Sequence, residues 1–288
     1  GEDGELKEDE DLFGLVGAIP LMGDFNGDGL AEKAIYFRGE WFIDVNGNGQ
    51  WDDEDLWAKL GTEVDLPVVG DWDGDGKDDI GIFGPEWPGD PEAIENEPGL
   101  PDPENQQKLL VAKNQPDIKA KNVPPIPEEA TYGHRLLKHS KTGQARADLI
   151  DHVFRYGGGT DKPVAGDWNG DGIDNIGMFR DGVWYLDTNG DGRWASGDNK
   201  FTFGQKGDLP VVGDWDGDGI DDLGVYRGGT WILDMNHDRT IDAADKVFEM
   251  GGQGDLPVVG DVDGDGIDDP GLYRDVDLPA TREARKAG

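Results

Sequence analysis

The chain has 288 residues, a formal net charge of −37 and no cysteine. This excess of acidic residues disfavours nucleic acid and anionic membranes as partners for most of the surface, and the lack of cysteine excludes disulfides, thiolate metal sites and a cysteine nucleophile. No stretch of the sequence approaches the ~20 apolar residues of a membrane-spanning helix.

A short sequence rich in Gly and Asp recurs along the chain. Its copies begin at Gly23, Gly70, Gly166, Gly213 and Gly260, and the fourth reads GDWDGDGIDD. Successive copies are 47 residues apart, except that 96 residues separate the second from the third, which is one unit plus an insertion. A fixed period of this size indicates a propeller or a solenoid.

Each unit contains four short β-rich runs, which is the strand content of one propeller blade. Residues 13–24 align without gaps to 203–214, so the chain starts with the end of a repeat, and 260–274 is the beginning of another. We therefore expect segments at about 12–16 and 18–23 to share a blade with 268–274. The sequence predicts an all-β fold, a five-bladed β-propeller of 47-residue repeats whose ring is closed by N- and C-terminal strands.

The propeller is predicted to span residues 12–274, between an acidic tail at 1–11 and a second tail at 275–288. An insertion, 84–151, interrupts the second unit. It begins as a Pro- and acid-rich loop, offers 107–114 as a candidate for the missing second strand, and is expected to be partly helical toward its end. The repeat resumes at residue 152.

The insertion also reverses the sign of the charge. Between Lys108 and Arg146 there are eight Lys and Arg residues against three acidic ones. Two interpretations stay open: the segment lies back on its own acidic propeller, or it projects as an arm that captures an anionic partner. The basic residues are Lys108, Lys113, Lys119, Lys121, Arg135, Lys138, Lys141 and Arg146.

The repeated sequence is a nine-residue short loop, D-x-[DN]-x-D-G-x-x-[DNE]. Oxygens at positions 1, 3 and 5, the backbone carbonyl at 7 and a carboxylate or amide at 9 can surround one hard cation, and Gly at 6 permits the sharp turn. The candidate ligands are Asp24, Asn26, Asp28, Leu30 and Glu32; Asp71, Asp73, Asp75, Lys77 and Asp79; Asp167, Asn169, Asp171, Ile173 and Asn175; Asp214, Asp216, Asp218, Ile220 and Asp222; and Asp261, Asp263, Asp265, Ile267 and Asp269.

A second motif is a twelve-residue loop with possible ligands at positions 1, 3, 5, 7, 9 and 12, which resembles an EF-hand or dockerin loop without flanking helices. Its third copy has Arg239 instead of Gly at position 6, and the histidine inside it, His237, is expected to face solvent. The candidate ligands are Asp44, Asn46, Asn48, Gln50, Asp52 and Asp55; Asp187, Asn189, Asp191, Arg193 and Asp198; and Asp234, Asn236, Asp238, Thr240, Asp242 and Asp245.

The chemistry of both motifs favours Ca²⁺, at up to eight sites. Oxygen-only ligands select hard cations, and irregular loops with carbonyl ligands suit the larger Ca²⁺ better than Mg²⁺. The alternative is that Asp, Asn and Gly only cap β-turns. The density of carboxylates favours metal, since adjacent negative charges repel strongly without it.

Three tryptophans, Trp41, Trp184 and Trp231, recur in the second β-rich run of their units. We expect them to pack between neighbouring blades. Stacking on a ligand is the alternative, because an exposed indole ring can serve as a platform for a sugar.

The pattern F-G-x-x-G-x-[IL]-P followed by G-D-x-[DN]-G-D-G resembles FG-GAP/VCBS-type calcium-binding propeller repeats, as in integrin α heads and bacterial surface proteins. The resemblance covers residues 12–83 and 152–274, and FGLVGAIP at 13–20 carries it most clearly. It implies a β-propeller with calcium in loops at the blade edges, and a role in adhesion or binding. Integrin-type heads have seven blades, whereas the phasing here gives five.

These observations predict an extracellular, calcium-binding module of a larger bacterial surface or secreted protein, with a protein or polysaccharide at the cell surface as partner. The alternatives are a glycan-binding or glycan-cleaving propeller, and a structural cap or spacer that docks a sister domain. We expect no enzymatic activity, since the only serines are Ser140 and Ser196 and no catalytic pattern surrounds them. The first residues, without Met or signal peptide, are those expected of a mature form or fragment.

Overall fold

The computed structural model describes residues 14–15, 17–52, 54–61, 63, 65–83, 136–139, 151–154, 161–190 and 197–274. Every helix or strand in these ranges is a β-strand, as the sequence predicted. Within the same ranges, no helix is long and apolar enough to cross a membrane.

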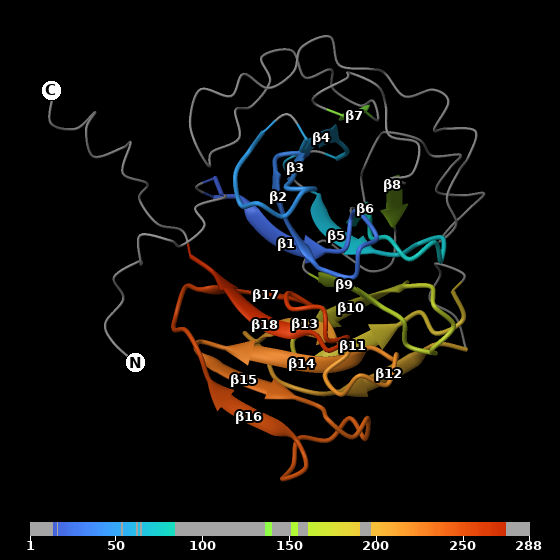
Figure 1. Ribbon diagram of the computed structural model, residues 1–288. Helices are drawn as coiled ribbons and strands as arrows, with labels where there is room; N and C mark the ends of the chain where they lie inside the picture. The colour runs from blue at the N-terminus through green and yellow to red at the C-terminus, as the bar shows by residue number, and fades with distance from the viewer. Residues whose placement is uncertain are drawn as a thin grey trace, which may run out of the picture.

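The strands form five small sheets (Figure 1). The first contains β1 (Ile19–Gly23), β2 (Glu32–Phe37), β3 (Glu40–Ile43), β4 (Leu56–Lys59) and β7 (Leu136–His139); the second β5 (Leu66–Gly70), β6 (Asp79–Phe83) and β8 (Asp151–Phe154); the third β9 (Lys162–Gly166), β10 (Asn175–Arg180), β11 (Val183–Leu186) and β12 (Asn199–Thr202); the fourth β13 (Leu209–Gly213), β14 (Asp222–Arg227), β15 (Thr230–Leu233) and β16 (Lys246–Glu249); and the fifth β17 (Leu256–Gly260) and β18 (Asp269–Tyr273). All pairings are antiparallel except that of β8 with β6.

The first strand of every sheet is an edge strand, and its sequence explains why. Each carries proline at its second position. Proline has no N–H to donate to a further strand, so within a sheet it is found mainly in edge strands. The Val and Ile residues of the same strands favour an extended backbone. The prolines are Pro20, Pro67, Pro163, Pro210 and Pro257.

The first strands also contact one another in turn. β1 contacts β5, β5 contacts β9, β9 contacts β13, β13 contacts β17, and β17 returns to β1. Figure 1 shows β17 (red) beside β1 (blue), although they lie at opposite ends of the described chain. Five backbone hydrogen bonds follow the same order, each from position 8 of one short loop to the carbonyl of position 1 in the preceding loop. Their donors and acceptors are Asp78 to Asp24, Asp174 to Asp71, Asp221 to Asp167, Asp268 to Asp214 and Ala31 to Asp261.

The core lies between neighbouring sheets, and the prediction for the recurring tryptophans is confirmed. Trp41, Trp184 and Trp231 are each fully buried and pack with residues of the next sheet as well as their own. Each indole N–H donates to a backbone carbonyl nineteen residues further along, at 3.2, 2.8 and 3.2 Å respectively. The burial of these rings leaves them unavailable for stacking on a ligand.

In the third and in the fourth sheet, an ion pair links the arginine that ends the second strand to the aspartate just before the first strand. Arg227, which ends β14, places its guanidinium Nε 2.7 Å and Nη2 2.8 Å from the two carboxylate oxygens of Asp208, next to β13. Arg180 makes the same bidentate contact with Asp161. The aspartate side chains are almost wholly buried, whereas the arginines are half-exposed.

Two expectations about the strands were wrong. We expected 18–23 to share a sheet with 268–274, but β1 pairs with β2, and β18 pairs only with β17. The strand with proline at its second position is therefore the first strand of each sheet, not the last. The two ends of the described part of the chain still meet, because the Tyr273 hydroxyl donates to the Leu15 carbonyl at 3.1 Å.

The second correction concerns the insertion. Residues 136–139 lie where partial helix was expected, yet they form β7, which extends the first sheet beside β4. In the second sheet β8 pairs directly with β6. The candidate strand at 107–114, the tails 1–11 and 275–288, and the side chains of the basic segment lie outside the described residues, so those predictions stay predictions.

Candidate functional site: two sets of acidic loops

The five short loops are the hairpin connections between the first and second strands of the five sheets. Position 1 follows the first strand directly, and position 9 is the first residue of the second strand. The loop of Asp214 shows the local geometry: its carboxylate accepts hydrogen bonds from the N–H groups of Gly217 (2.7 Å), Asp218 (3.2 Å) and Gly219 (2.8 Å). Gly217 and Gly219 adopt positive φ, of 77° and 82°, which favours glycine at both positions.

The same hydrogen bonds to position 1 recur in the other loops, at Asp24, Asp71, Asp167 and Asp261. The turn chemistry that we considered as the alternative to metal binding is therefore present. It does not exclude metal binding, because Oδ2 of position 1 accepts one N–H group in each loop and keeps a second lone pair. In Asp261, burial acts to raise the pKa, but the N–H groups of Gly266, Gly264, Asp263 and Asp265 together lower it. These amides hold the group in its ionised form.

The loops bring acidic oxygens together. In four of the five short loops, three carboxylates each place one oxygen within 4.8 Å of the other two. The groups are Asp24, Asp28 and Glu32; Asp71, Asp73 and Asp79; Asp214, Asp216 and Asp218; and Asp261, Asp263 and Asp265. The loop of Asp167 forms no such group, because Asn169 and Asn175 replace two of the acids.

Position 9 is the buried end of the short loop in four of the copies. Glu32, Asp79, Asn175 and Asp222 are buried, whereas Asp269 is partly exposed. Burial, followed by the negative charges of Asp24 and Asp28, raises the pKa of Glu32 to about 8. A divalent cation between these carboxylates would offset both the burial and the repulsion.

The twelve-residue loops join the third and fourth strands of three sheets. Positions 1 and 12 flank the loop at the strand ends, and Asp44 and Asp55 are both fully buried there. Burial raises the pKa of Asp55 to about 8, and the charges of Asp44 and Asp52 contribute to the increase. Among the described residues, no three acidic side chains of a single twelve-residue loop converge as those of the short loops do. Asp191 and Arg193 lie outside the described residues.

The third twelve-residue loop keeps its shape without glycine at position 6. Arg239 adopts φ +61°, and its N–H donates to Asp234 at 2.8 Å, as Gly49 donates to Asp44 at 2.6 Å. The guanidinium of Arg239 lies 4.4 Å from the ring centre of Phe201 in the preceding sheet. This cation–π contact gives the arginine a packing role.

Some oxygens in these loops have no hydrogen-bond partner despite being buried. They are Oδ2 of Asp222 and the Oδ1 atoms of Asp55, Asp234 and Asp245. Buried carboxylate oxygens normally accept hydrogen bonds or bind cations. The donor set of the loops therefore fits a bound cation, and oxygen ligands from irregular loops fit Ca²⁺.

Sequence reasoning missed position 8 of the short loop. Asp78, Asp174, Asp221 and Asp268 occupy it, and each accepts a hydrogen bond from the N–H of position 1 in the preceding loop. They line a cavity of about 260 Å³ bounded by the ends of all five first strands. Burial, with the charges of neighbouring aspartates, raises the pKa of Asp78 and Asp221 to about 7. The available signal was that position 8 is Asp in four of the five copies and Ala31 in the other.

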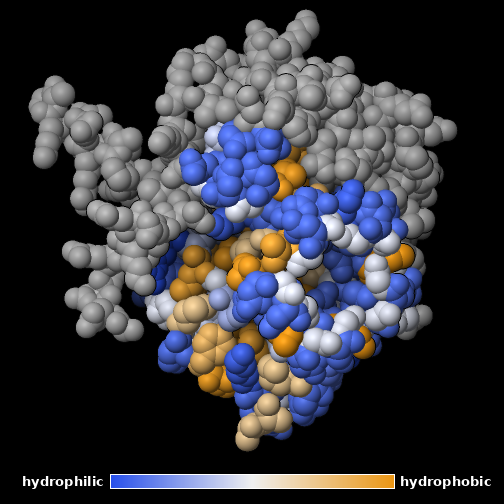
Figure 2. All heavy atoms as spheres, in the orientation of Figure 1, coloured by the Kyte–Doolittle hydropathy of each residue, from blue (hydrophilic) through white to orange (hydrophobic). Residues whose placement is uncertain are grey.

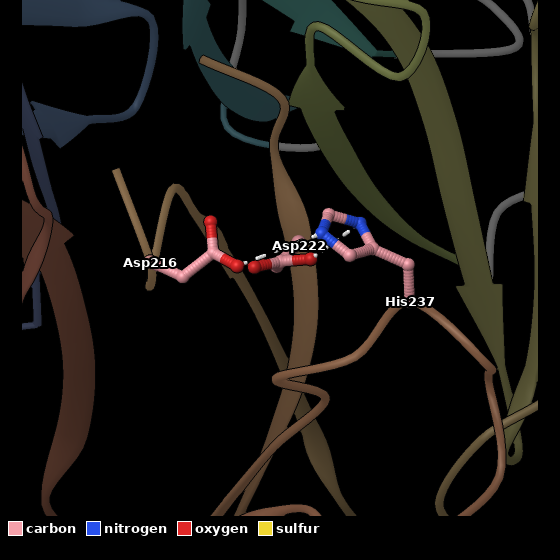
Figure 3. Close-up of side chains that lie close together, drawn as sticks. All are labelled: Asp216, Asp222 and His237. Carbon is pink, nitrogen blue, oxygen red and sulfur yellow. Dashed lines mark ion pairs between the residues drawn. The ribbon is translucent and has the colours of Figure 1, made fainter. Parts of the chain in front are cut away.

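His237 is exposed, as expected, but sequence reasoning missed its neighbours. Its imidazole points into the short loop of the same sheet, where Nδ1 lies 2.9 Å from Asp222 Oδ1. Figure 3 shows the side chains of His237, Asp222 and Asp216 directed toward one another. Among the described residues, the loop of Asp214 is thus the only short loop in which carboxylate oxygens meet an imidazole.

No family model and no curated protein matches this chain. It is similar to a solved structure of a lectin from Agrocybe aegerita, described as recognising non-reducing terminal N-acetylglucosamine. The match has 15% sequence identity and a TM-score of 0.30, and it covers 93% of this chain and 69% of that one.

Proposed function

We propose that this chain is a calcium-binding, five-bladed β-propeller of the FG-GAP/VCBS type, and that it serves as an extracellular binding or adhesion module of a larger bacterial surface or secreted protein. The proposal for the fold is supported by the cyclic order of contacts among the five first strands. Five backbone hydrogen bonds between successive short loops follow the same order.

The observation that carries the calcium role is the convergence of carboxylates in the short loops. Oxygens of positions 1, 3, 5 and 9 meet in groups of three in four loops, on a chain that already carries a charge of −37. Holding such groups together without a cation is costly, because like charges a few ångströms apart repel. Calcium bound in the loops would also stabilise these hairpins, which hydrogen-bond to the short loops of the neighbouring sheets.

Thermal unfolding with controlled metal content tests this role. A ligand that binds only the native state stabilises it by about 2.7 kcal/mol per site at a hundredfold excess over Kd. EDTA should therefore lower the Tm sharply, Ca²⁺ should restore it, and Mg²⁺ should restore less. An EDTA-insensitive Tm, with no calcium found by elemental analysis of the purified protein, would exclude the calcium role.

The surface around β17 and β18 combines hydrophobic and hydrophilic side chains. Figure 2 shows hydrophobic residues (orange) among hydrophilic ones over the region that these strands occupy in Figure 1. The residues of β18 are all only partly buried, whereas those of β6 are all buried. Glycan binding, the alternative role, stays a prediction, and among the described residues no large aromatic side chain is exposed to support it. A glycan array run with Ca²⁺ and with EDTA separates the two roles.

A further inference from the structure

His237 brings an imidazole into one short loop, and its place in the chain explains how. The residue is position 4 of the twelve-residue loop between β15 and β16, where the other two copies have Gly47 and Gly190. All three adopt positive φ, of 55°, 64° and 70°. A histidine in this conformation is uncommon, and the side chain, although exposed, is directed toward Asp222 at the start of β14.

The imidazole reaches three carboxylates. Nδ1 lies 2.9 Å from Asp222 Oδ1, and Nε2 lies 3.5 Å from Asp218 Oδ2 and 3.9 Å from Asp216 Oδ2. One donor atom each from Asp216, Asp222 and His237 falls within 4.8 Å of the other two. We call these three residues the His237 cluster. Nitrogen and oxygen ligands bind Zn²⁺ at about 2.0–2.2 Å. Small side-chain rotations would bring all three donors to this distance from one ion.

Asp222 supplies an independent sign that a ligand belongs here. Its side chain is 1% exposed, Oδ2 has no hydrogen-bond partner, and Oδ1 faces the imidazole of His237. The corresponding carboxylate of the first loop, Glu32, is satisfied instead, by the N–H of Phe25 at 3.0 Å and the side-chain amide of Asn26 at 2.7 Å. The difference follows from position 3, which is Asn in the first loop and Asp216, without an N–H to donate, in the fourth.

A small cavity adjoins the cluster. It has a volume of about 40 Å³ and is lined by Asp222, Asp234 and His237 among others. Asp234 is also buried and has an unpartnered Oδ1. Arg239 lines the same cavity and is the one cationic side chain on it, but its guanidinium is held over the ring of Phe201. The space is sufficient for one ion or water.

We propose that the His237 cluster binds a first-row transition-metal ion such as Zn²⁺, with the imidazole of His237 and the carboxylates of Asp216 and Asp222 as ligands. Imidazole is a ligand of zinc, copper, iron and nickel, whereas Ca²⁺ takes oxygen ligands. The other short loops have only oxygen donors, so one site of this protein differs in its metal preference. The inference rests on the proposed cation-binding role of the short loops, and it specifies the kind of metal ion for the loop of Asp214.

Zinc titration of the calcium-saturated full-length chain tests the proposal. Calorimetry should show one Zn²⁺ per chain that excess Ca²⁺ does not displace. The chain has four histidines, so long-range ¹H–¹⁵N NMR can follow each imidazole, and only that of His237 should shift as a metal ligand. His237→Gly should weaken Zn²⁺ binding by more than about tenfold. Loss of a residue that only supports a metal ligand already weakens binding by about that factor.

Two variants keep the experiment decisive. His237→Gly matches the residue found in the other two loops, so its fold is expected to be retained, and its response to Ca²⁺ reports separately on the proposed calcium role. Replacing His134, His139 and His152 together with Gln should leave the zinc site intact. Equal Zn²⁺ affinity in His237→Gly and the parent chain would overturn the proposal. So would a parent chain that binds no Zn²⁺, because His237 would then only pair with the carboxylates.

Discussion

Asp78 and Asp24 join two neighbouring sheets through a reciprocal pair of hydrogen bonds. The N–H of Asp24 donates to Asp78 Oδ2 at 2.7 Å, and the N–H of Asp78 donates to the Asp24 carbonyl at 2.8 Å. The same pair recurs at the next three junctions. Glycine before position 1 makes room for it: a Cβ on Gly23 would lie 2.7 Å from the Asp78 carboxylate.

The first prediction distinguishes the contribution of the side-chain hydrogen bond to stability from that of the negative charge on Asp78. Asp78→Ala removes the acceptor and leaves the Asp24 N–H without its partner, whereas Asp78→Asn keeps an acceptor and removes the charge. We expect Asp78→Ala to be less stable than Asp78→Asn by about 1–3 kcal/mol, measured by denaturant unfolding in EDTA. Equal stabilities of the two variants would show that the side chain contributes only its charge.

The second prediction concerns pH. Burial and neighbouring carboxylates raise the pKa of Asp78 and Asp221 to about 7 and that of Asp268 to about 6, above the ordinary value of about 3.9. The native state therefore retains protons that the unfolded chain releases, so stability falls as pH rises from about 4 to about 7. In EDTA, the variant with Asn at all three positions should show a shallower fall than the parent chain. Parallel curves would contradict the origin of the effect.

The third prediction compares a buried ion pair with an exposed one. Arg227→Gln leaves the buried Asp208 carboxylate without its bidentate partner, and we expect a loss of about 2–3 kcal/mol. This is below the value for fully buried pairs because Arg227 is half-exposed. Lys206→Gln breaks a pair with Asp181 that is exposed on both sides, and the change should stay within about 0.5 kcal/mol. Chemical unfolding of the two variants measures their free energies of unfolding. Similar losses of stability in both would refute the prediction.

The fourth prediction concerns the junction between the fifth sheet and the first. Ala31 makes the backbone hydrogen bond to Asp261 at 2.7 Å but has no side-chain acceptor for the Asp261 N–H. Ala31→Asn would supply one without adding charge to the aspartate-lined cavity, and the Cβ it needs is already present. We expect a gain of about 0.5–1.5 kcal/mol. A lower Tm for this variant would mean that the junction differs in geometry from the other four.

The sequence predicted most of the framework because the repeat fixes strands, turns and loops at the same spacing in every unit. It predicted the buried tryptophans and the short loops whose carboxylates lie close together, since both follow from local patterns. It misplaced 18–23, because the Gly-Asp sequence is more conspicuous than the L-P strand at which a sheet begins. The pairing of β7 with β4 and the direction of His237 depend on contacts between distant segments, which the periodicity of one chain does not contain.

The first strands and short loops make one kind of contact that every pair of neighbouring sheets shares, and this has a consequence for how the molecule can change. Among the described residues, the first sheet has five strands, the second three and the fifth two. Yet the backbone hydrogen bond from position 8 to position 1 is present at every junction. A segment can therefore be gained or lost at the outer edge of a sheet while the sheets keep their mutual arrangement. Variation in the number of strands is thereby confined to the part of each sheet that lies away from this shared junction.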